Sequence, residues 1–163
     1  MNAQARLKGR IRLAECDVTV TRVFDAPRDL VFRTWTEPAH LARWWGPRDY
    51  TNPVCELDAR TGGAIFVRMC APDGRVVLMT GTFREVVAPD RLVLSAIVAA
   101  SNGEAMFEGL VTATFADENG KTRLTVREQA VAFVPAAAPI LANMESSWTE
   151  SLKRLATVVS PPA

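Results

Sequence analysis

Five short turn signals divide the middle of the sequence into runs of similar length that are rich in β-branched residues. Signals of this composition are typical of the tight turns that join neighbouring strands. In chain order they are Gly62-Gly63, Asp73-Gly74, Pro89-Asp90, Asn102-Gly103 and Asn119-Gly120. They predict six consecutive strands, which pair antiparallel because the connections between them are short. The predicted strands span residues 52–58, 64–71, 75–87, 91–99, 106–117 and 121–130.

Other patterns precede and follow this run of strands. Residues 16–24 alternate between β-branched and polar side chains, which predicts a first strand. Pro27 and Pro38 mark the starts of two short helices, and Gly46-Pro47 ends the second helix directly after Trp45. Near the carboxyl end, apolar residues recur at spacings of three and four, which predicts one stripe on a single long helix. They are Leu141, Met144, Trp148, Leu152, Leu155 and Val159.

The order of these elements predicts an α+β fold: one strand, two short helices, six strands and a long helix. We expect the antiparallel sheet to curve around the final helix, which presents its apolar stripe to the concave face. A sheet that grips a helix along only part of its length leaves a space, and the two short helices are placed to cover its mouth. We expect a tail at residues 1–15, a single domain at 16–159 and a second tail at 160–163.

Composition narrows the classes of partner. Nineteen basic and eighteen acidic residues among 163 give a net charge of +1, too little for a phosphate backbone, so we expect no nucleic-acid partner. The chain has no signal peptide and no apolar run long enough to cross a membrane, which predicts a cytoplasmic protein without a membrane span. Cys16, Cys55 and Cys70 are odd in number and widely spaced, which indicates neither a disulfide framework nor a CxxC site and favours buried thiols.

Motifs for common chemistries are absent from the sequence. There is no GxSxG elbow, no phosphate-binding loop and no GxGxxG run. His40 is the only histidine, and no cluster of metal-ligating residues accompanies it. We therefore assign no catalytic residue, no metal and no cofactor from the sequence.

Several stretches in a fixed order carry a resemblance to a known family. They are RVFDAPRDLVFRTWTEPAHLARWWGP at 22–47, LDARTGG at 57–63, PDG at 72–74, GTFREVVAPDRLV at 81–93 and MESSWTESLKRL at 144–155. In these residues the chain resembles the family of proteins similar to the activator of the 90-kDa heat-shock-protein ATPase. That family lies within the START and birch-pollen-allergen superfamily of helix-grip domains.

The resemblance implies a helix-grip fold and several possible activities. Members of the superfamily bind lipids, hormones and other hydrophobic small molecules between the sheet and the long helix. Some relatives are aromatases or cyclases that act on polyketides, and the family takes its name from a co-chaperone.

Candidate ligand-binding residues follow from periodicity and strand parity. Trp44 and Trp45 either pack the end of the core or line a pocket, and methionines either fill the core or give a pocket an adaptable wall. Glu128 shares the inward parity of its strand, and Glu145 lies beside the stripe of the last helix, so each is either a ligand-facing acid or simply solvated. The full set is Trp44, Trp45, Met69, Phe83, Phe107, Val111, Glu128, Met144, Glu145 and Trp148.

Three functions are compatible with this sequence. The leading hypothesis is a binding protein that holds a lipid, a sterol or an aromatic polyketide in an apolar cavity, and the sequence leaves open whether the protein is also an enzyme. The second is a cyclase or hydrolase that uses Glu128 or Glu145 as an acid or base. The third is a module that interacts with a chaperone through an exposed patch.

Overall fold

The structure of the protein is a computed structural model that describes residues 11–159. The predicted tail at 160–163 and most of the tail predicted at 1–15 lie outside the described residues. The first described strand begins at Ala14, two residues before the predicted start at residue 16.

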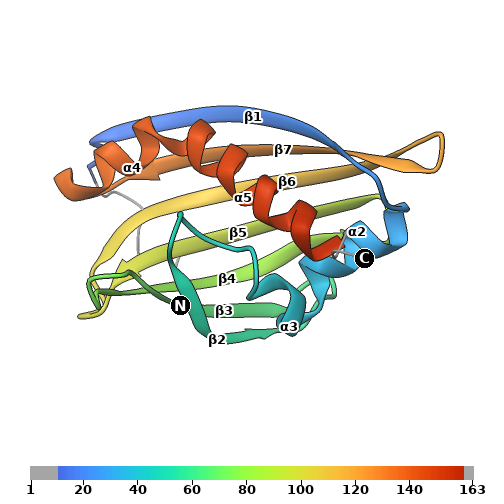
Figure 1. The fold of residues 1–163 in the computed structure, drawn as a ribbon. Coiled ribbons are helices and arrows are strands. Elements are labelled where there is room, and N and C mark those ends of the chain that lie inside the picture. Colours follow the sequence, from blue (N-terminus) through green and yellow to red (C-terminus); the bar gives the residue numbers. More distant parts are fainter. Residues whose placement is uncertain (1–10, 160–163) are drawn as a thin grey trace.

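Seven strands form one antiparallel sheet in the order β1-β7-β6-β5-β4-β3-β2. The α+β fold with a curved antiparallel sheet is thus confirmed, and each strand end lies within about two residues of its predicted position. The first strand pairs with the last, so the sheet order places β1 beside β7 (Figure 1). The strands are β1 Ala14–Phe24, β2 Thr51–Leu57, β3 Ala64–Cys70, β4 Val76–Val87, β5 Arg91–Ala100, β6 Ala105–Glu118 and β7 Lys121–Ala132.

Alternating burial explains why these residues form a sheet with one covered face. In β7 every second residue from Thr122 to Ala132 is buried, and the intervening side chains are exposed or half-buried. Strand β6 alternates in the same way, so Phe107 and Val111 face inward together with Glu128. This period of two places one apolar face of the sheet against the helices.

The helices cover the concave face and one end of the sheet. The last helix, α5, crosses the concave face diagonally, while α2 and α3 lie at one end of the sheet (Figure 1). The helical elements are α2 Arg28–Thr36, α3 Pro38–Leu41, a 3-10 turn at Pro135–Ala137, α4 Ala138–Ala142 and α5 Met144–Val159.

The single helix predicted from Leu141 onward is wrong, because the chain breaks at Asn143 into α4 and α5. The Asn143 side chain donates a hydrogen bond of 2.8 Å to the carbonyl of Pro139, and its backbone leaves the helical region at φ −104° and ψ 12°. The Asn143 carbonyl then accepts hydrogen bonds from Ser146 and Ser147, which begin the next helix. A side chain that competes for backbone groups in this way interrupts a helix.

The second short helix is also shorter than predicted, since α3 ends at Leu41 and Trp44 and Trp45 lie in the turn that follows. The amides of both tryptophans still donate to the Leu41 carbonyl, at 3.2 and 3.1 Å. The side chains of Leu41, Trp44 and Trp45 therefore stay close together. The hydrogen bond from the Trp44 amide spans three residues, as in a 3-10 helix, and the one from Trp45 spans four, as in an α-helix.

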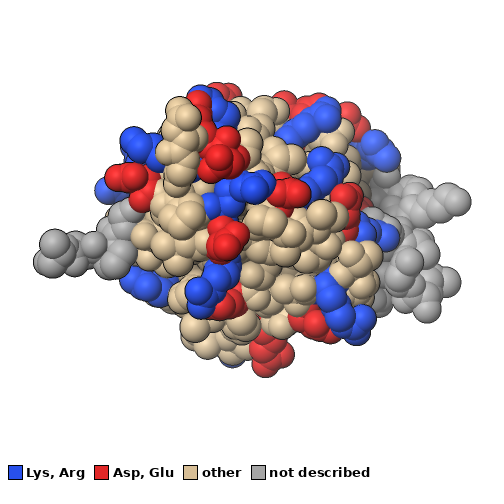
Figure 2. Space-filling view, turned by 90° about the vertical axis from the view of Figure 1, so that its right-hand side faces the viewer, with Lys and Arg blue, Asp and Glu red and all other residues tan. Residues whose placement is uncertain are grey.

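Charged side chains of both signs are interspersed on the face shown in Figure 2. This distribution agrees with the net charge of +1 for the whole chain. The face in view therefore offers no extended basic surface.

The seat of α5 on the sheet can be tested at Leu155, which is fully buried. Leu155→Ala should lower the free energy of unfolding by about 2–5 kcal/mol, because truncation removes buried methyl groups and leaves a void. Urea denaturation measures this loss, and Lys153→Ala on the exposed side of α5 is the control. Equal stability of the two variants would contradict the packing of α5 described above.

Candidate functional site

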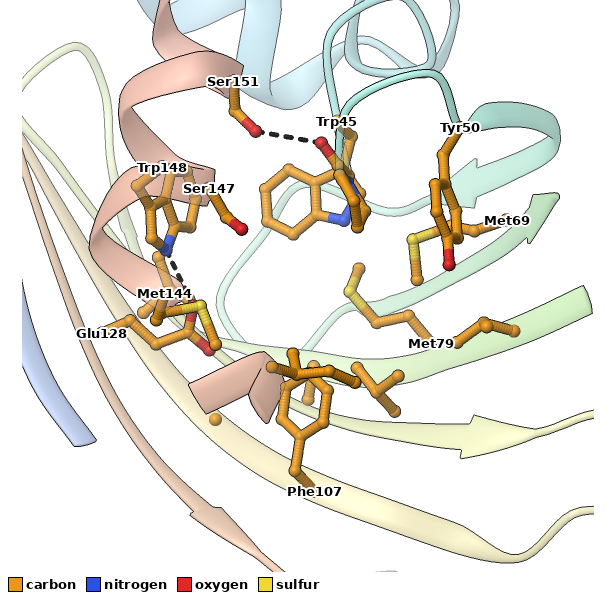
Figure 3. Close-up of a pocket in the computed structure, with 18 of the residues that line it drawn as sticks. Trp45, Tyr50, Met69, Met79, Phe107, Glu128, Met144, Ser147, Trp148 and Ser151 are labelled. Atoms are coloured by element: carbon orange, nitrogen blue, oxygen red, sulfur yellow. Dashed lines mark hydrogen bonds between the residues drawn. The ribbon is translucent and has the colours of Figure 1, made fainter. Parts of the chain in front are cut away.

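A cavity of about 370 Å³ lies between the sheet and the last two helices (Figure 3). Its walls come from strands β3 to β7, from α4 and α5, and from the segment that joins α3 to β2. The lining is mostly apolar, and Met69, Met79, Met106 and Met144 all contribute to it. The flexible thioether side chains give this wall an adaptable shape.

Eight of the residues proposed from the sequence line this cavity. They are Trp44, Trp45, Met69, Phe107, Val111, Glu128, Met144 and Trp148. They come from five separate parts of the chain, and the curvature of the sheet beneath α5 brings them together (Figure 3).

Phe83 and Glu145 lie elsewhere. Phe83 is buried in a sealed layer with Trp35 and Leu41, because α2 and α3 cover that end of the sheet. Glu145 is exposed, since it follows Met144 on the helix and so points away from the face that meets the cavity. Neither residue lines the cavity between sheet and helix.

Four tryptophans from three parts of the chain pack together at one end of the cavity. The Trp35 and Trp148 rings are stacked, with centroids 5.8 Å apart and planes inclined by 10°. The Trp45 ring is nearly perpendicular to that of Trp148, with centroids 5.6 Å apart. The indole N–H of Trp44 donates to the carbonyl of Thr34 at 2.9 Å. Trp44 and Trp45 therefore pack in the core and also line the cavity. Both alternatives that the sequence left open are true of these two residues.

Among residues 11–159, Glu128 is the only acidic residue in the cavity lining, and it is only 7% exposed. Its Oε1 accepts a hydrogen bond of 2.8 Å from the Trp148 indole N–H (Figure 3). Burial raises the pKa of the Glu128 carboxyl to about 7, because the charged form loses its hydration, and the hydrogen bond from Trp148 acts in the opposite direction. The carboxyl is thus suited to exchange a proton near neutral pH.

Gly109 makes room for this carboxyl. It lies on β6 between Phe107 and Val111, and a methyl group at its Cα would collide with Oε2 of Glu128. We did not single it out from the sequence. The available signal was a glycine inside a strand, on the same face as two large apolar residues, which often marks a close approach.

A short segment borders the cavity opposite the sheet and is tied to α5. The Gly46 carbonyl accepts hydrogen bonds from Ser151 Oγ, at 3.0 Å, and from the Arg154 guanidinium. Arg154 also donates to the Pro47 carbonyl at 3.2 Å. Tyr50, another lining residue that the sequence did not point to, follows in the same segment (Figure 3).

The described residues contain no group of three or more histidine, cysteine or acidic side chains that could hold a metal ion. The thiols of Cys16, Cys55 and Cys70 are free, and the three residues are only half-buried, so the prediction that they are buried is wrong. Within residues 11–159, no helix is both long enough and apolar enough to cross a membrane.

A curved antiparallel sheet that holds a carboxyl-terminal helix across its concave face, with a cavity between them, defines the class of helix-grip domains. Residues 25–160 match the sequence model of the family described as Activator of Hsp90 ATPase homolog 1-like protein. The match covers most of the chain, and the protein belongs to this family. The resemblance stated from the sequence is thereby confirmed.

Solved structures from several bacteria share the fold. An uncharacterised protein from Rhizobium leguminosarum superposes with a TM-score of 0.74 at 22% identity, over 93% of this chain and 99% of its own. A protein from Chromobacterium violaceum gives 0.72 at 25% identity, over 90% and 98% of the two chains. A protein from Staphylococcus epidermidis gives 0.70 at 26% identity, over 91% and 92%. No curated protein matches the chain.

The burial of Glu128 predicts that stability depends on pH. The carboxyl binds its proton more tightly in the folded protein, with a pKa of about 7, than at its ordinary value of 4.5. Stability from this group is therefore complete below pH 4.5 and is lost as the pH rises to about 7, by about 3 kcal/mol in total. Urea denaturation between pH 4 and 8 should show this loss in the wild type and not in Glu128→Gln. The control Glu145→Gln should keep the wild-type slope, and an unchanged slope in Glu128→Gln would contradict the assignment.

The bonds from Arg154 predict that this residue orders the segment at 46–50. Arg154→Ala should make the backbone amides of that segment exchange with solvent roughly tenfold faster, because hydrogen bonds from a charged donor are lost. Hydrogen exchange followed by mass spectrometry measures the change. Arg123→Ala, which removes a surface pair with Glu118, should leave this segment unaffected. Identical exchange in all three proteins would show that Arg154 does not order it.

Proposed function

We propose that the protein binds a hydrophobic small molecule in the cavity between the sheet and α5. The observation that supports this proposal most strongly is a space of about 370 Å³ bounded mainly by apolar side chains. The space is partly open to solvent, so its apolar side chains contact water that a hydrophobic ligand would displace. The volume also lies within the range typical of small-molecule sites.

The shape and chemistry of the lining favour a mostly apolar ligand with few polar groups. Aromatic rings border the cavity on several sides (Figure 3), and four methionines contribute to the rest of the lining. Lipids, sterols and aromatic polyketides remain the classes that we propose, and the cytoplasmic location likewise remains a prediction.

A second candidate function is proton transfer within the same cavity. Glu128 lies inside it and Glu145 does not, so only Glu128 remains as the acid or base of a cyclase or hydrolase. A carboxyl with a pKa of about 7 is matched to such a role at neutral pH. The chaperone-binding hypothesis has no comparable support, because the exposed large apolar side chains of residues 11–159 lie on separate elements or in the segment before β1.

Ligand binding can be tested with a variant that fills the cavity. Ser147 points into it from α5 (Figure 3), and Ser147→Phe should reduce affinity at least about tenfold through steric exclusion. Tryptophan fluorescence during titration with fatty acids, sterols and aromatic polyketides measures binding. Native mass spectra of the freshly purified protein reveal any molecule that remains bound.

The matched control is Ser146→Phe, the same substitution at the adjacent exposed position. It should bind like the wild type. If neither the mass spectra nor any titration reveals a ligand, the binding proposal fails and the proton-transfer candidate loses its substrate site as well.

A further inference from the structure

The polar end of the cavity is the carboxyl group of Glu128. One of its oxygens accepts a hydrogen bond from the described part of the chain, and the other does not. Trp148 donates to Oε1 of Glu128, and no other hydrogen bond to this carboxyl is found among residues 11–159. The second oxygen, Oε2, lies beside Gly109, where the lack of a side chain leaves it uncovered. Oε2 does not belong to the fully buried, unpartnered side-chain atoms of residues 11–159, so it is accessible from the cavity, and a ligand with a donor at this position would bond to it.

The carboxylate of Glu128 has no basic residue beside it in the described lining of the cavity. Of the residues that the structure describes, Arg75 is the only basic one in the lining, and its guanidinium lies 3.3 Å from Asp73 in the hairpin between β3 and β4. Two strands, β5 and β6, separate β4 from β7, which carries Glu128. Nothing positive in the described lining therefore stands next to the buried carboxylate.

Few other ionisable groups approach Glu128 from the elements packed against it. On β1 the nearest is Cys16, whose thiol pKa is raised by burial and further by the charge of Glu128. β6 presents Gly109 and Val111, and α5 presents Met144 and Trp148, none of which titrates. Tyr50 lies across the cavity in the segment after α3 (Figure 3).

One aromatic ring adjoins this carboxyl, and other aromatic rings line the same cavity. Trp148 contacts it directly, and Trp45 packs against Trp148 with a centroid distance of 5.6 Å. Phe107 lies on the sheet side of the cavity (Figure 3). Aromatic faces attract cations, most strongly where water is excluded.

We propose that the cavity selects hydrophobic amines, whose ammonium group donates to Oε2 of Glu128 while the apolar part lies along the methionine and aromatic walls. This inference rests on the proposed function and specifies its ligand class. An ammonium group supplies both the missing donor and the missing positive charge. A neutral alcohol supplies only the donor, and a carboxylate would add a second negative charge in a site of low dielectric constant.

Three probes of similar shape and different charge test the proposal: phenylbutylamine, phenylbutanol and phenylbutyrate. Isothermal titration calorimetry at pH 8, where Glu128 is mostly ionised, should rank the amine first by roughly tenfold or more. The affinity of the amine should fall by up to about tenfold for each pH unit below 7, since protonation of Glu128 competes with binding. A carboxylate probe should show the opposite trend.

Variants separate the role of the carboxyl from that of the cavity. Glu128→Gln keeps the shape and removes the charge, so it should lose the preference for phenylbutylamine and the pH dependence while still binding phenylbutanol. Glu145→Gln, which changes an exposed carboxyl on α5, should behave like the wild type. Trp148→Phe removes the donor to Oε1, which should move the midpoint of the pH dependence upward. Circular dichroism establishes that each variant is folded.

The results distinguish a failure of amine selection from a failure of the proposed binding of hydrophobic molecules. Equal affinity for the amine and the alcohol, or an amine preference that survives in Glu128→Gln, would overturn the selection of amines and leave the apolar cavity as a binding site. A preference for phenylbutyrate would overturn it too. If no probe binds and no hydrophobic compound from the wider panel binds either, the proposed function itself fails.

Discussion

The side chain of Trp148 connects three parts of the protein that are distant in sequence. Its ring stacks on Trp35 of α2 and stands perpendicular to Trp45, and its N–H donates to Glu128 of β7. These contacts hold α5 against both the sheet and the helices at its end. The cavity lies beside these contacts, between the first half of α5 and the sheet, and Trp148 itself lines it. One buried indole thus belongs both to the packed core and to the wall of the cavity.

The cavity reduces the packing of the core and also changes the chemistry of the carboxyl group that it contains. An apolar space forfeits packing contacts, and a carboxyl within it loses hydration, which raises the pKa of Glu128 to about 7. The sealed layer around Phe83 and the tryptophan cluster supplies compensating burial at the other end of the sheet. Such a division between a stable scaffold and a less stable site is expected of proteins that bind small molecules.

Much of the fold could be predicted because its signals are local. Turn residues such as Asn119-Gly120 impose the hairpins, and the alternation of burial in β7 follows from a period of two that is visible in the sequence. The break at Asn143 was missed because the apolar spacing continues across it, and this spacing outweighed the local signal of an asparagine whose side chain bonds to the Pro139 carbonyl four residues earlier. The early end of α3 was missed for a similar reason, since Leu41, Trp44 and Trp45 stay together in either geometry.

By itself, the sequence determined the order of the elements, the antiparallel pairing, the inward parity of Glu128 and the family to which the chain belongs. These properties depend on neighbours along the chain or on recurring motifs. Only the tertiary structure decided which inward residues meet the cavity: it placed Glu128 inside, left Glu145 in solvent and enclosed Phe83 behind α2 and α3. The reason is geometric, because the curvature of the sheet and the angle at which α5 crosses it arise from all contacts together, and no local pattern encodes them.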